Sequence, residues 1–168
     1  MKKFNTVATG GTFDHLHAGH AALLKRSFDL GETVVIGVTS DAFASREGKS
    51  PDQTYAERAD VLERFLRSGF PGRKYVIARL DDYFGPGISA PEVGAIVVTR
   101  ETASRVPIAN ELRSAKGFPP LEVETVDFVL ADDGKPISST RIRKGEIDPE
   151  GRILASGTKT KSNNSRKG

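Results

Sequence analysis

The sequence predicts an α/β fold with a five-stranded parallel sheet and helices on both of its faces. Segments such as Thr33–Val38 are rich in β-branched residues and lack polar alternation, which is typical of strands buried on both faces of a parallel sheet. Amphipathic segments separate these strands, and that alternation indicates right-handed βαβ units. We expect strands over residues 4–9, 33–38, 74–80, 95–99 and 121–130.

Four helices are expected between and after these strands. Apolar residues recur at helical spacing over residues 18–30, and Gly31 ends that segment. Thr54 and Glu57 have the spacing of a capping box that opens the next helix, which Gly69 ends. Two further helices are expected over residues 103–116 and from 138 to about 145, whereas residues 39–53 and 81–91 are expected to form loops.

Charge and cysteine content limit the kinds of protein that this chain can be. The 168 residues contain no cysteine, so disulfides and cysteine-bound zinc are excluded and a cytoplasmic location is expected. No apolar run approaches the ~20 residues that span a bilayer, so we expect no membrane partner. Residues 155–168 carry four basic residues and no acid, and without them the net charge of +3 becomes −1. We therefore expect one domain over residues 1–154 and a basic, disordered tail over residues 155–168, with no specific nucleic-acid partner.

All three histidines of the chain, His15, His17 and His20, lie within six residues, where the first strand leads into the first helix. Gly10 and Gly11 precede them and let the backbone approach a ligand closely. A helix N-terminus offers free amides, and imidazoles placed there donate to phosphate oxygens. The pattern predicts a phosphate site at the carboxyl end of the sheet. Two alternatives remain: incidental turn residues, and a zinc ion bound by the three histidines.

Two segments far apart in the sequence resemble the signatures of one superfamily. Residues 10–20 are Gly-Gly-Thr-Phe-Asp-His-Leu-His-Ala-Gly-His, and residues 137–143 are Ile-Ser-Ser-Thr-Arg-Ile-Arg. In this order and strand–helix context, they resemble the two phosphate motifs of the HxGH nucleotidyltransferases. The resemblance implies a Rossmann-like nucleotidyltransferase fold over the domain.

The segments between the two motifs resemble the archaeal and eukaryotic type of phosphopantetheine adenylyltransferase, over residues 4 to about 150. The resemblance implies transfer of AMP from ATP to 4′-phosphopantetheine, which gives dephospho-coenzyme A and pyrophosphate, with Mg²⁺ bound mainly through the ATP phosphates. Two alternatives stay open: an HxGH enzyme of the FAD synthetase or cytidylyltransferase type, and a non-catalytic nucleotide- or RNA-binding module that uses the basic tail. The supporting segments are residues 37–41, 55–58, 80–86, 97–102, 108–113 and 143–148.

The same resemblance implies roles for the first motif and for the loop after the second strand. His20 is expected to stabilise the α-phosphate of ATP, and His17 to hold ATP phosphates. Thr12 is expected to orient the attacking phosphate of phosphopantetheine. Lys49 matches the family's mobile lysine and is expected to neutralise charge between the two substrates, with a solvated loop lysine as the alternative. Backbone contacts to ATP are expected from Gly10 and Gly11.

The second motif is expected to bind the far end of ATP. Ser138, Ser139 and Thr140 are expected to present hydroxyls and helix-start amides to the β- and γ-phosphates, or else to cap the last helix. Arg143 is expected to reach the same phosphates, with a surface position as the alternative. Together with the first motif, these residues would form a two-part phosphate site.

Further polar residues lie on or beside the predicted helices. Asn110 and Arg113 resemble family positions near the nucleotide, with ordinary helix-surface roles as the alternative. Arg100 and Arg105 depart from the family pattern, so the resemblance assigns them no role. Arg58 stands at a helix start and is expected to pair with a nearby carboxylate.

Overall fold

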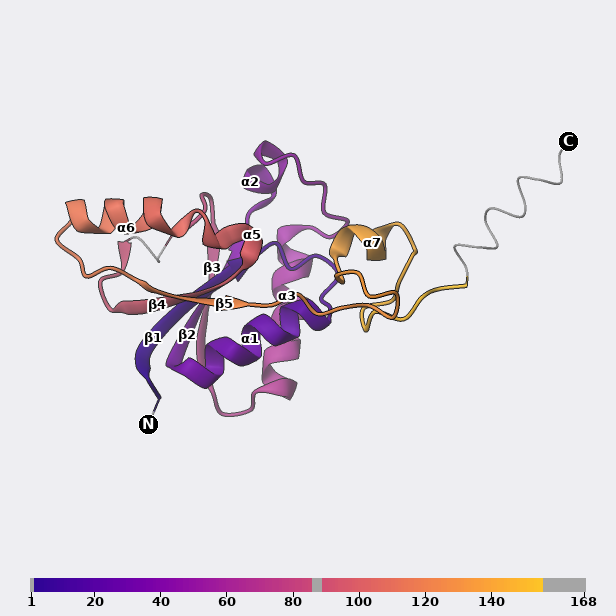
Figure 1. The fold of residues 1–168 in the computed structure, drawn as a ribbon, viewed down its shortest axis with the longest axis horizontal. Coiled ribbons are helices and arrows are strands. Elements are labelled where there is room, and N and C mark those ends of the chain that lie inside the picture. Colours follow the sequence, from indigo (N-terminus) through magenta and orange to yellow (C-terminus); the bar gives the residue numbers. More distant parts are fainter. Residues whose placement is uncertain (1, 86–88, 156–168) are drawn as a thin grey trace, which may run out of the picture.

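The structure, a computed structural model, describes residues 2–85 and 89–155 and contains a five-stranded sheet (Figure 1). Neighbouring strands are parallel throughout, in the spatial order β3-β2-β1-β4-β5, which confirms the predicted fold class. Residues 156–168, which make up most of the expected basic tail, lie outside the described residues. The strands are β1 (Phe4–Gly11), β2 (Gly31–Thr39), β3 (Lys74–Leu80), β4 (Val93–Thr99) and β5 (Glu122–Val126).

Helices connect the strands, and two of the longer ones match their predicted segments closely. Thr54 and Glu57 form the predicted capping box at the start of α3, which ends at Gly69. In the described part of the chain, no helix is both long and apolar enough to cross a membrane. The helices are α1 (Ala18–Leu30), α2 (Asp41–Arg46), α3 (Tyr55–Gly69), α5 (Arg100–Ala103), α6 (Val106–Ala115) and α7 (Ser139–Arg143).

The prediction of an unbroken loop over residues 39–53 is wrong, because α2 occupies part of it. Ser40 caps this helix, since its hydroxyl oxygen accepts the N–H of Phe43 at 3.1 Å. Phe43 and Ala44 are buried, so the short helix is stabilised by packing rather than by its length. The polar residues around it masked this pair of buried positions in the sequence.

Two predicted boundaries also differ from the structure for local reasons. The helix expected over residues 103–116 begins later, as α6 at Val106, and the short helix α5 precedes it over Arg100–Ala103. Pro107 lies in the first turn of α6, where the missing N–H costs least, so it favours a new helix start. The fifth strand ends at Val126, which pairs with Thr99, the last residue of β4. Beyond this pair, β4 has no further residue with which β5 could pair.

Four of the helices, α1, α3, α5 and α6, form two layers, one on each face of the sheet. In Figure 1, α1 and α3 lie on one side of the sheet, and α5 and α6 lie on the other. Val7 and Ala8 are consecutive in β1 and point into different buried clusters, as alternation along a strand requires. The first cluster contains residues of α1 and α3, and the second contains Val106 and Ala109 of α6.

The order of the strands locates the site. β1 lies between β2 and β4, so the chain continues from β1 through α1 to one side and returns as β4 on the other. In open parallel sheets, ligands bind at such a point, beyond the carboxyl ends of the strands. Three segments lie at this edge: the turn from residue 12 to 17, residues 40–54, and α5.

Candidate active site

The turn between β1 and α1 contains two residues in a backbone conformation that L side chains rarely adopt. Phe13 has a φ of 56° and His15 has a φ of 48°. Such residues cost on the order of 1–3 kcal/mol each and persist only where their surroundings hold them. The ring of Phe13 is fully buried in the core beneath α1 and α3. The shape of the turn is therefore imposed by tertiary contacts.

Asp14 connects this turn to two segments that are distant in the sequence. Its carboxylate accepts the backbone N–H groups of Asp52 at 3.1 Å and Gln53 at 3.0 Å, and the Nη1–H of Arg143 at 2.7 Å. Its backbone carbonyl accepts the hydroxyl of Ser139 at 2.6 Å. Burial alone would raise the pKa of Asp14, but these donors outweigh burial and hold the pKa below its usual value. The two predicted phosphate motifs are thus brought together.

His17 and His20 cap the start of α1 through their ring nitrogens. The Nδ1 of His17 accepts the N–H of Gly19 at 3.0 Å, and the Nδ1 of His20 accepts the N–H of His17 at 3.2 Å. The two rings stack with their centroids 3.8 Å apart. Because each Nδ1 is an acceptor, the proton of each neutral ring is assigned to Nε2. Within residues 2–85 and 89–155, neither Nε2 has a hydrogen-bond partner, so each is available as a donor.

Both rings are uncharged at neutral pH. Burial is the larger cause and the positive charge of a protonated His15 the second cause that together lower the pKa of His17 to about 4. Burial lowers the pKa of His20 to about 3, with His17 as the second cause and Asp14 acting in the opposite direction. The pair therefore offers two neutral N–H donors to a ligand rather than two cations.

His15 lies apart from this pair. Its Nε2 is 2.7 Å from Oδ2 of Asp52, and its backbone N–H donates to Oε1 of Gln53 at 3.2 Å. Among the described residues, the group of acids and histidines close enough to share an ion is Asp14, His15 and Asp52. The structure thus does not gather the three histidines that the zinc alternative requires. The Asp14 carboxylate is already bound by Arg143.

Thr12 has the one orphaned side-chain atom of the site. Across the described ranges, its Oγ1 is the buried side-chain nitrogen or oxygen atom without a hydrogen-bond partner. An unpaired buried hydroxyl costs about 1–3 kcal/mol, and it is usually completed by a water or a ligand. Thr12 also directly follows Gly11, which lines a pocket. A contact between this hydroxyl and a substrate stays a prediction that the geometry supports.

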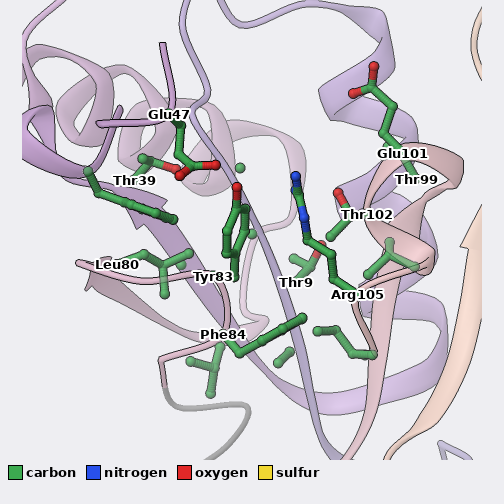
Figure 2. A pocket seen from close by; sticks show the side chains of 18 of the residues that line it. Thr9, Thr39, Glu47, Leu80, Tyr83, Phe84, Thr99, Glu101, Thr102 and Arg105 are labelled. Carbon is green, nitrogen blue, oxygen red and sulfur yellow. The ribbon is translucent and has the colours of Figure 1, made fainter. Parts of the chain in front are cut away.

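A pocket of about 440 Å³ opens over the carboxyl halves of β1, β2 and β4, on the face that carries α5 and α6 (Figure 2). Glycines form part of its floor. Gly10 pairs with Gly37, and a Cβ on Gly37 would lie 2.6 Å from Leu80. Side chains at these two positions would displace Leu80 and enter the pocket. The two glycines therefore leave that part of the pocket open. Gly10 and Gly11 both line this pocket, and their backbone contacts to ATP stay a prediction.

Sequence reasoning assigned no role to two residues that form one wall of this pocket. The guanidinium of Arg105 lies over the ring of Tyr83, 3.9 Å from its centroid (Figure 2). Tyr83 in turn meets the ring of Phe43 edge-on, at 5.1 Å between centroids. A cation held on an aromatic face keeps its hydrogen-bond donors free for a ligand. Arg100, by contrast, lies on the surface and pairs with Asp127 at 2.8 Å.

The loop after β2 brings Lys49 to the same pocket. Its backbone N–H donates to the carbonyl of Ala44 at 2.9 Å, so Lys49 follows directly on the end of α2. Lys49 is one of the residues that line the pocket, as is Glu47. The expected ion pair of Arg58 is confirmed, with Asp41 as its partner at 2.8 Å.

The hydroxyls of the second motif are partly engaged within the protein. Ser138 caps α7, because its oxygen accepts the N–H of Arg141 at 3.2 Å. The Ser139 hydroxyl is held by the carbonyl of Asp14, and Thr140 accepts an Nη2–H of Arg143 at 3.1 Å. The motif is brought to the first turn, as expected. Its contacts to phosphates stay a prediction.

Asn110 and Arg113 are not brought to the site. The Arg113 side chain is fully buried and donates to the carbonyls of Ala90, Val93 and Pro119, which lie at the amino ends of β4 and β5. Asn110 exchanges hydrogen bonds with the backbone of Leu121, also at that edge. Their expected ATP contacts are therefore corrected to structural roles. These residues fix α6 to the strand starts, at the edge opposite the nucleotide motifs.

Comparisons with known proteins agree with this geometry. The model of the cytidylyltransferase-like family matches residues 8–145. A phosphopantetheine adenylyltransferase from Methanothermobacter thermautotrophicus is 47% identical over 91% of this chain and 92% of its own length. One from Methanopyrus kandleri is 43% identical over 88% of this chain and 94% of its own. A solved structure of a protein of unknown function from Archaeoglobus fulgidus superposes with a TM-score of 0.65 at 29% identity, over 76% of this chain and 90% of its own length. This chain therefore belongs to the cytidylyltransferase-like family and, within it, to the phosphopantetheine adenylyltransferases.

Proposed function

We propose that this protein transfers AMP from ATP to 4′-phosphopantetheine, giving dephospho-coenzyme A and pyrophosphate. The names of the relatives support this activity, since those relatives match nearly the full chain. The structural observation that carries the proposal is the arrangement at the carboxyl end of β1. Two neutral histidine donors and an unpaired threonine hydroxyl lie in the turn that follows the glycine floor of the pocket.

The reaction forms a bond between a phosphate oxygen of phosphopantetheine and the α-phosphorus of ATP, and breaks the bond from that phosphorus to pyrophosphate. Such a step requires alignment and charge stabilisation more than covalent help. Neutral Nε2–H donors on His17 and His20 suit this role. They bind a ground-state phosphate less tightly than imidazolium would, and their hydrogen bonds strengthen as negative charge grows on the oxygens.

Two polyanions must meet in the site, so the proposal needs cations as well. Lys49 and Arg105 line the pocket and are assigned to neutralise the acceptor phosphate and the α-phosphate between them. Thr12 is assigned to donate its free hydroxyl to the attacking phosphate. Arg143 and the second motif are assigned to the β- and γ-phosphates, with Asp14 holding them beside the first turn.

The pocket is assigned to the pantetheine arm of the acceptor. Its volume of about 440 Å³ suits a chain of this size, and its wall mixes apolar residues with polar ones. Phe84, Ile96 and Val98 supply apolar surface, while Thr102 supplies a hydroxyl. An amide-containing aliphatic chain presents the same mixture of surfaces.

Magnesium is assigned to the ATP phosphates, and the protein contributes little to holding it. In the part of the chain that the structure describes, the candidate group for an ion is Asp14, His15 and Asp52. The carboxylate of Asp14 is occupied by Arg143 and by two amides, so this group does not fit a hard divalent cation. ATP carries the oxygens that Mg²⁺ prefers. A cytoplasmic location accompanies this proposal.

The decisive test is pyrophosphate release from Mg-ATP by the purified protein with 4′-phosphopantetheine, flavin mononucleotide or glycerol 3-phosphate as acceptor. Turnover with phosphopantetheine, and dephospho-coenzyme A identified by mass spectrometry, are expected. Turnover confined to either other acceptor would replace the proposed substrate but leave the proposed role of the site in adenylyl transfer intact.

A His20→Ala variant with full activity would contradict the mechanism. Loss of turnover when a chelator removes Mg²⁺, and its return with Mg²⁺, tests the metal.

A further inference from the structure

We propose that Arg58 is a positioning residue for adenylyl transfer, which acts by holding Thr12 and the start of α2 in one arrangement. The inference rests on the proposed function. It concerns a buried cation that the mechanism above does not use. The Arg58 side chain is fully buried, although arginine is among the residues that are least often buried.

The Arg58 guanidinium joins four segments around the site. Its Nη1 donates to the carbonyls of Thr12 at 2.7 Å and Thr39 at 2.8 Å. Its Nε donates to the carbonyl of Gln53 at 3.1 Å, and its Nη2 donates to Oδ1 of Asp41 at 2.8 Å. These partners lie in the turn after β1, at the end of β2, before α3 and at the start of α2. The four bonds give the buried charge the compensation that burial demands.

The contact with Thr12 links Arg58 to the reacting groups. Arg58 fixes the carbonyl of Thr12, whose own hydroxyl has no partner among the described residues. The following residue, Phe13, has a left-handed backbone, which is a strained conformation that the surrounding contacts must hold in place. Releasing the carbonyl would let the peptide between Thr12 and Phe13 rotate and would move the hydroxyl. A misplacement of about 1 Å costs up to ~100-fold in rate.

The contacts with Thr39 and Asp41 extend this effect to the lysine. Asp41 begins α2, and its other carboxylate oxygen accepts the N–H of Tyr55 at 3.2 Å. The start of α2 is thus fixed to the start of α3. Lys49 follows the opposite end of this short helix. A single guanidinium therefore orients both the turn with the free hydroxyl and the segment with the pocket lysine.

Arg73 provides a matched control. Its Nη2 also donates to two backbone carbonyls, those of Phe28 at 2.7 Å and Gly31 at 3.1 Å. These lie at the end of α1 and the start of β2, at the edge of the sheet opposite the site. Arg73→Lys and Arg58→Lys both keep the positive charge and remove the planar group that reaches several acceptors. The two variants differ in whether the carbonyls that they release belong to the site.

The experiment measures kcat, the KM for each substrate and the melting temperature of Arg58→Lys, Arg73→Lys and Thr12→Val, and of each lysine variant combined with Thr12→Val. Assays run below the melting transition of every variant. We expect Arg58→Lys to lower kcat about 10- to 100-fold with KM for ATP changed by less than about 3-fold. Arg73→Lys should lower the melting temperature and leave kcat within about 2-fold.

The double variants separate positioning from general destabilisation. Thr12→Val should cost about 10-fold or more in kcat in the wild-type and Arg73→Lys backgrounds, but less than about 3-fold in Arg58→Lys, because the hydroxyl is already misplaced there. Equal costs in all backgrounds, or an Arg58→Lys enzyme with near wild-type kcat, would overturn the proposal.

If Arg58→Lys does not fold, Asp41→Asn takes its place. It removes the charge partner at an exposed position, and it should lower kcat and reduce the cost of Lys49→Ala. Unchanged kcat in Asp41→Asn would then overturn the proposal. Failure of the wild-type enzyme to use phosphopantetheine would instead contradict the proposed function, and the same cycle applies to whichever acceptor is turned over.

Discussion

The neutral state of His17 and His20 predicts a specific loss of stability in mild acid. The folded protein keeps both rings uncharged, with pKa values of about 4 and about 3, whereas an unfolded histidine titrates near 6.5. Below pH 6.5 the unfolded chain therefore binds protons that the folded chain does not. The contribution of the two neutral histidines to the free energy of unfolding is therefore fully present above pH 6.5. It falls as the pH drops towards 4 for His17 and towards 3 for His20.

The size of this loss follows from the two pKa values. Between pH 7.5 and pH 5.0, each unfolded histidine gains a proton over about 1.5 pH units that the folded ring does not gain. At about 1.4 kcal/mol per unit, each ring lowers the free energy of unfolding by about 2 kcal/mol, and the pair by about 4 kcal/mol. Such a loss is a large part of the 5–15 kcal/mol that is typical of a domain, so it is measurable by urea unfolding.

A double variant, His17→Asn with His20→Asn, isolates this effect. Asparagine offers an acceptor oxygen near the position of Nδ1, so the cap bonds to Gly19 and to residue 17 can persist without a titrating ring. Urea unfolding of the ligand-free proteins at both pH values is expected to show a pH-dependent loss about 4 kcal/mol smaller in the double variant. Equal losses in the two proteins, within about 1 kcal/mol, would refute neutral histidines and with them the proposed Nε2–H donors.

Three further predictions concern single side chains. Thr12→Val should leave the free energy of unfolding unchanged or raise it, because it removes an unpaired buried hydroxyl, while kcat falls. Parallel unfolding and kinetic measurements check both effects. A destabilised variant would indicate that the hydroxyl has a partner in the folded protein. Arg105→Gln should raise KM for phosphopantetheine about 10-fold and KM for ATP by less than about 3-fold, because Arg105 lines the pocket proposed for the acceptor. Equal changes in the two KM values would instead indicate that Arg105 contacts the nucleotide. Asp14→Asn should lower the free energy of unfolding by about 1–3 kcal/mol and raise KM for ATP, because Arg143 loses its charge partner. Calorimetry measures the first effect and steady-state kinetics the second. An unchanged melting temperature would argue against a stabilising contact between the two motifs.

Much of the sheet was predictable because its central strands carry their signal locally. Strands buried on both faces need continuous β-branched sequence, and Gly31 and Gly69 mark the helix ends. Elements that depend on distant partners were less accessible. The helix α2 is stabilised by the burial of Phe43, and β5 stops where β4 stops, and neither fact is written in the local pattern.

The site shows the same division. The histidines, the glycines and the second motif could be found because they form short contiguous segments. Asn110 and Arg113 were misplaced, since a polar residue on an amphipathic helix gives no sign of which sheet edge it will meet. Arg105 could not be assigned without the three-dimensional contact with Tyr83, although an arginine in the segment after β4 is a weak signal.

The first turn of the site owes its shape to residues outside the motif that identifies it. Two positive φ angles cannot be maintained by residues 12–17 alone. Asp14 draws amides from residues 52 and 53 and a guanidinium from Arg143, and Arg58 holds the carbonyl of Thr12. The long intervening sequence is thus required for more than binding a second substrate, because it supplies the groups that keep the histidine turn strained and its donors in place. A short peptide with the same histidine motif would lack those partners and would relax, and with the relaxation it would lose the arrangement that phosphoryl chemistry needs.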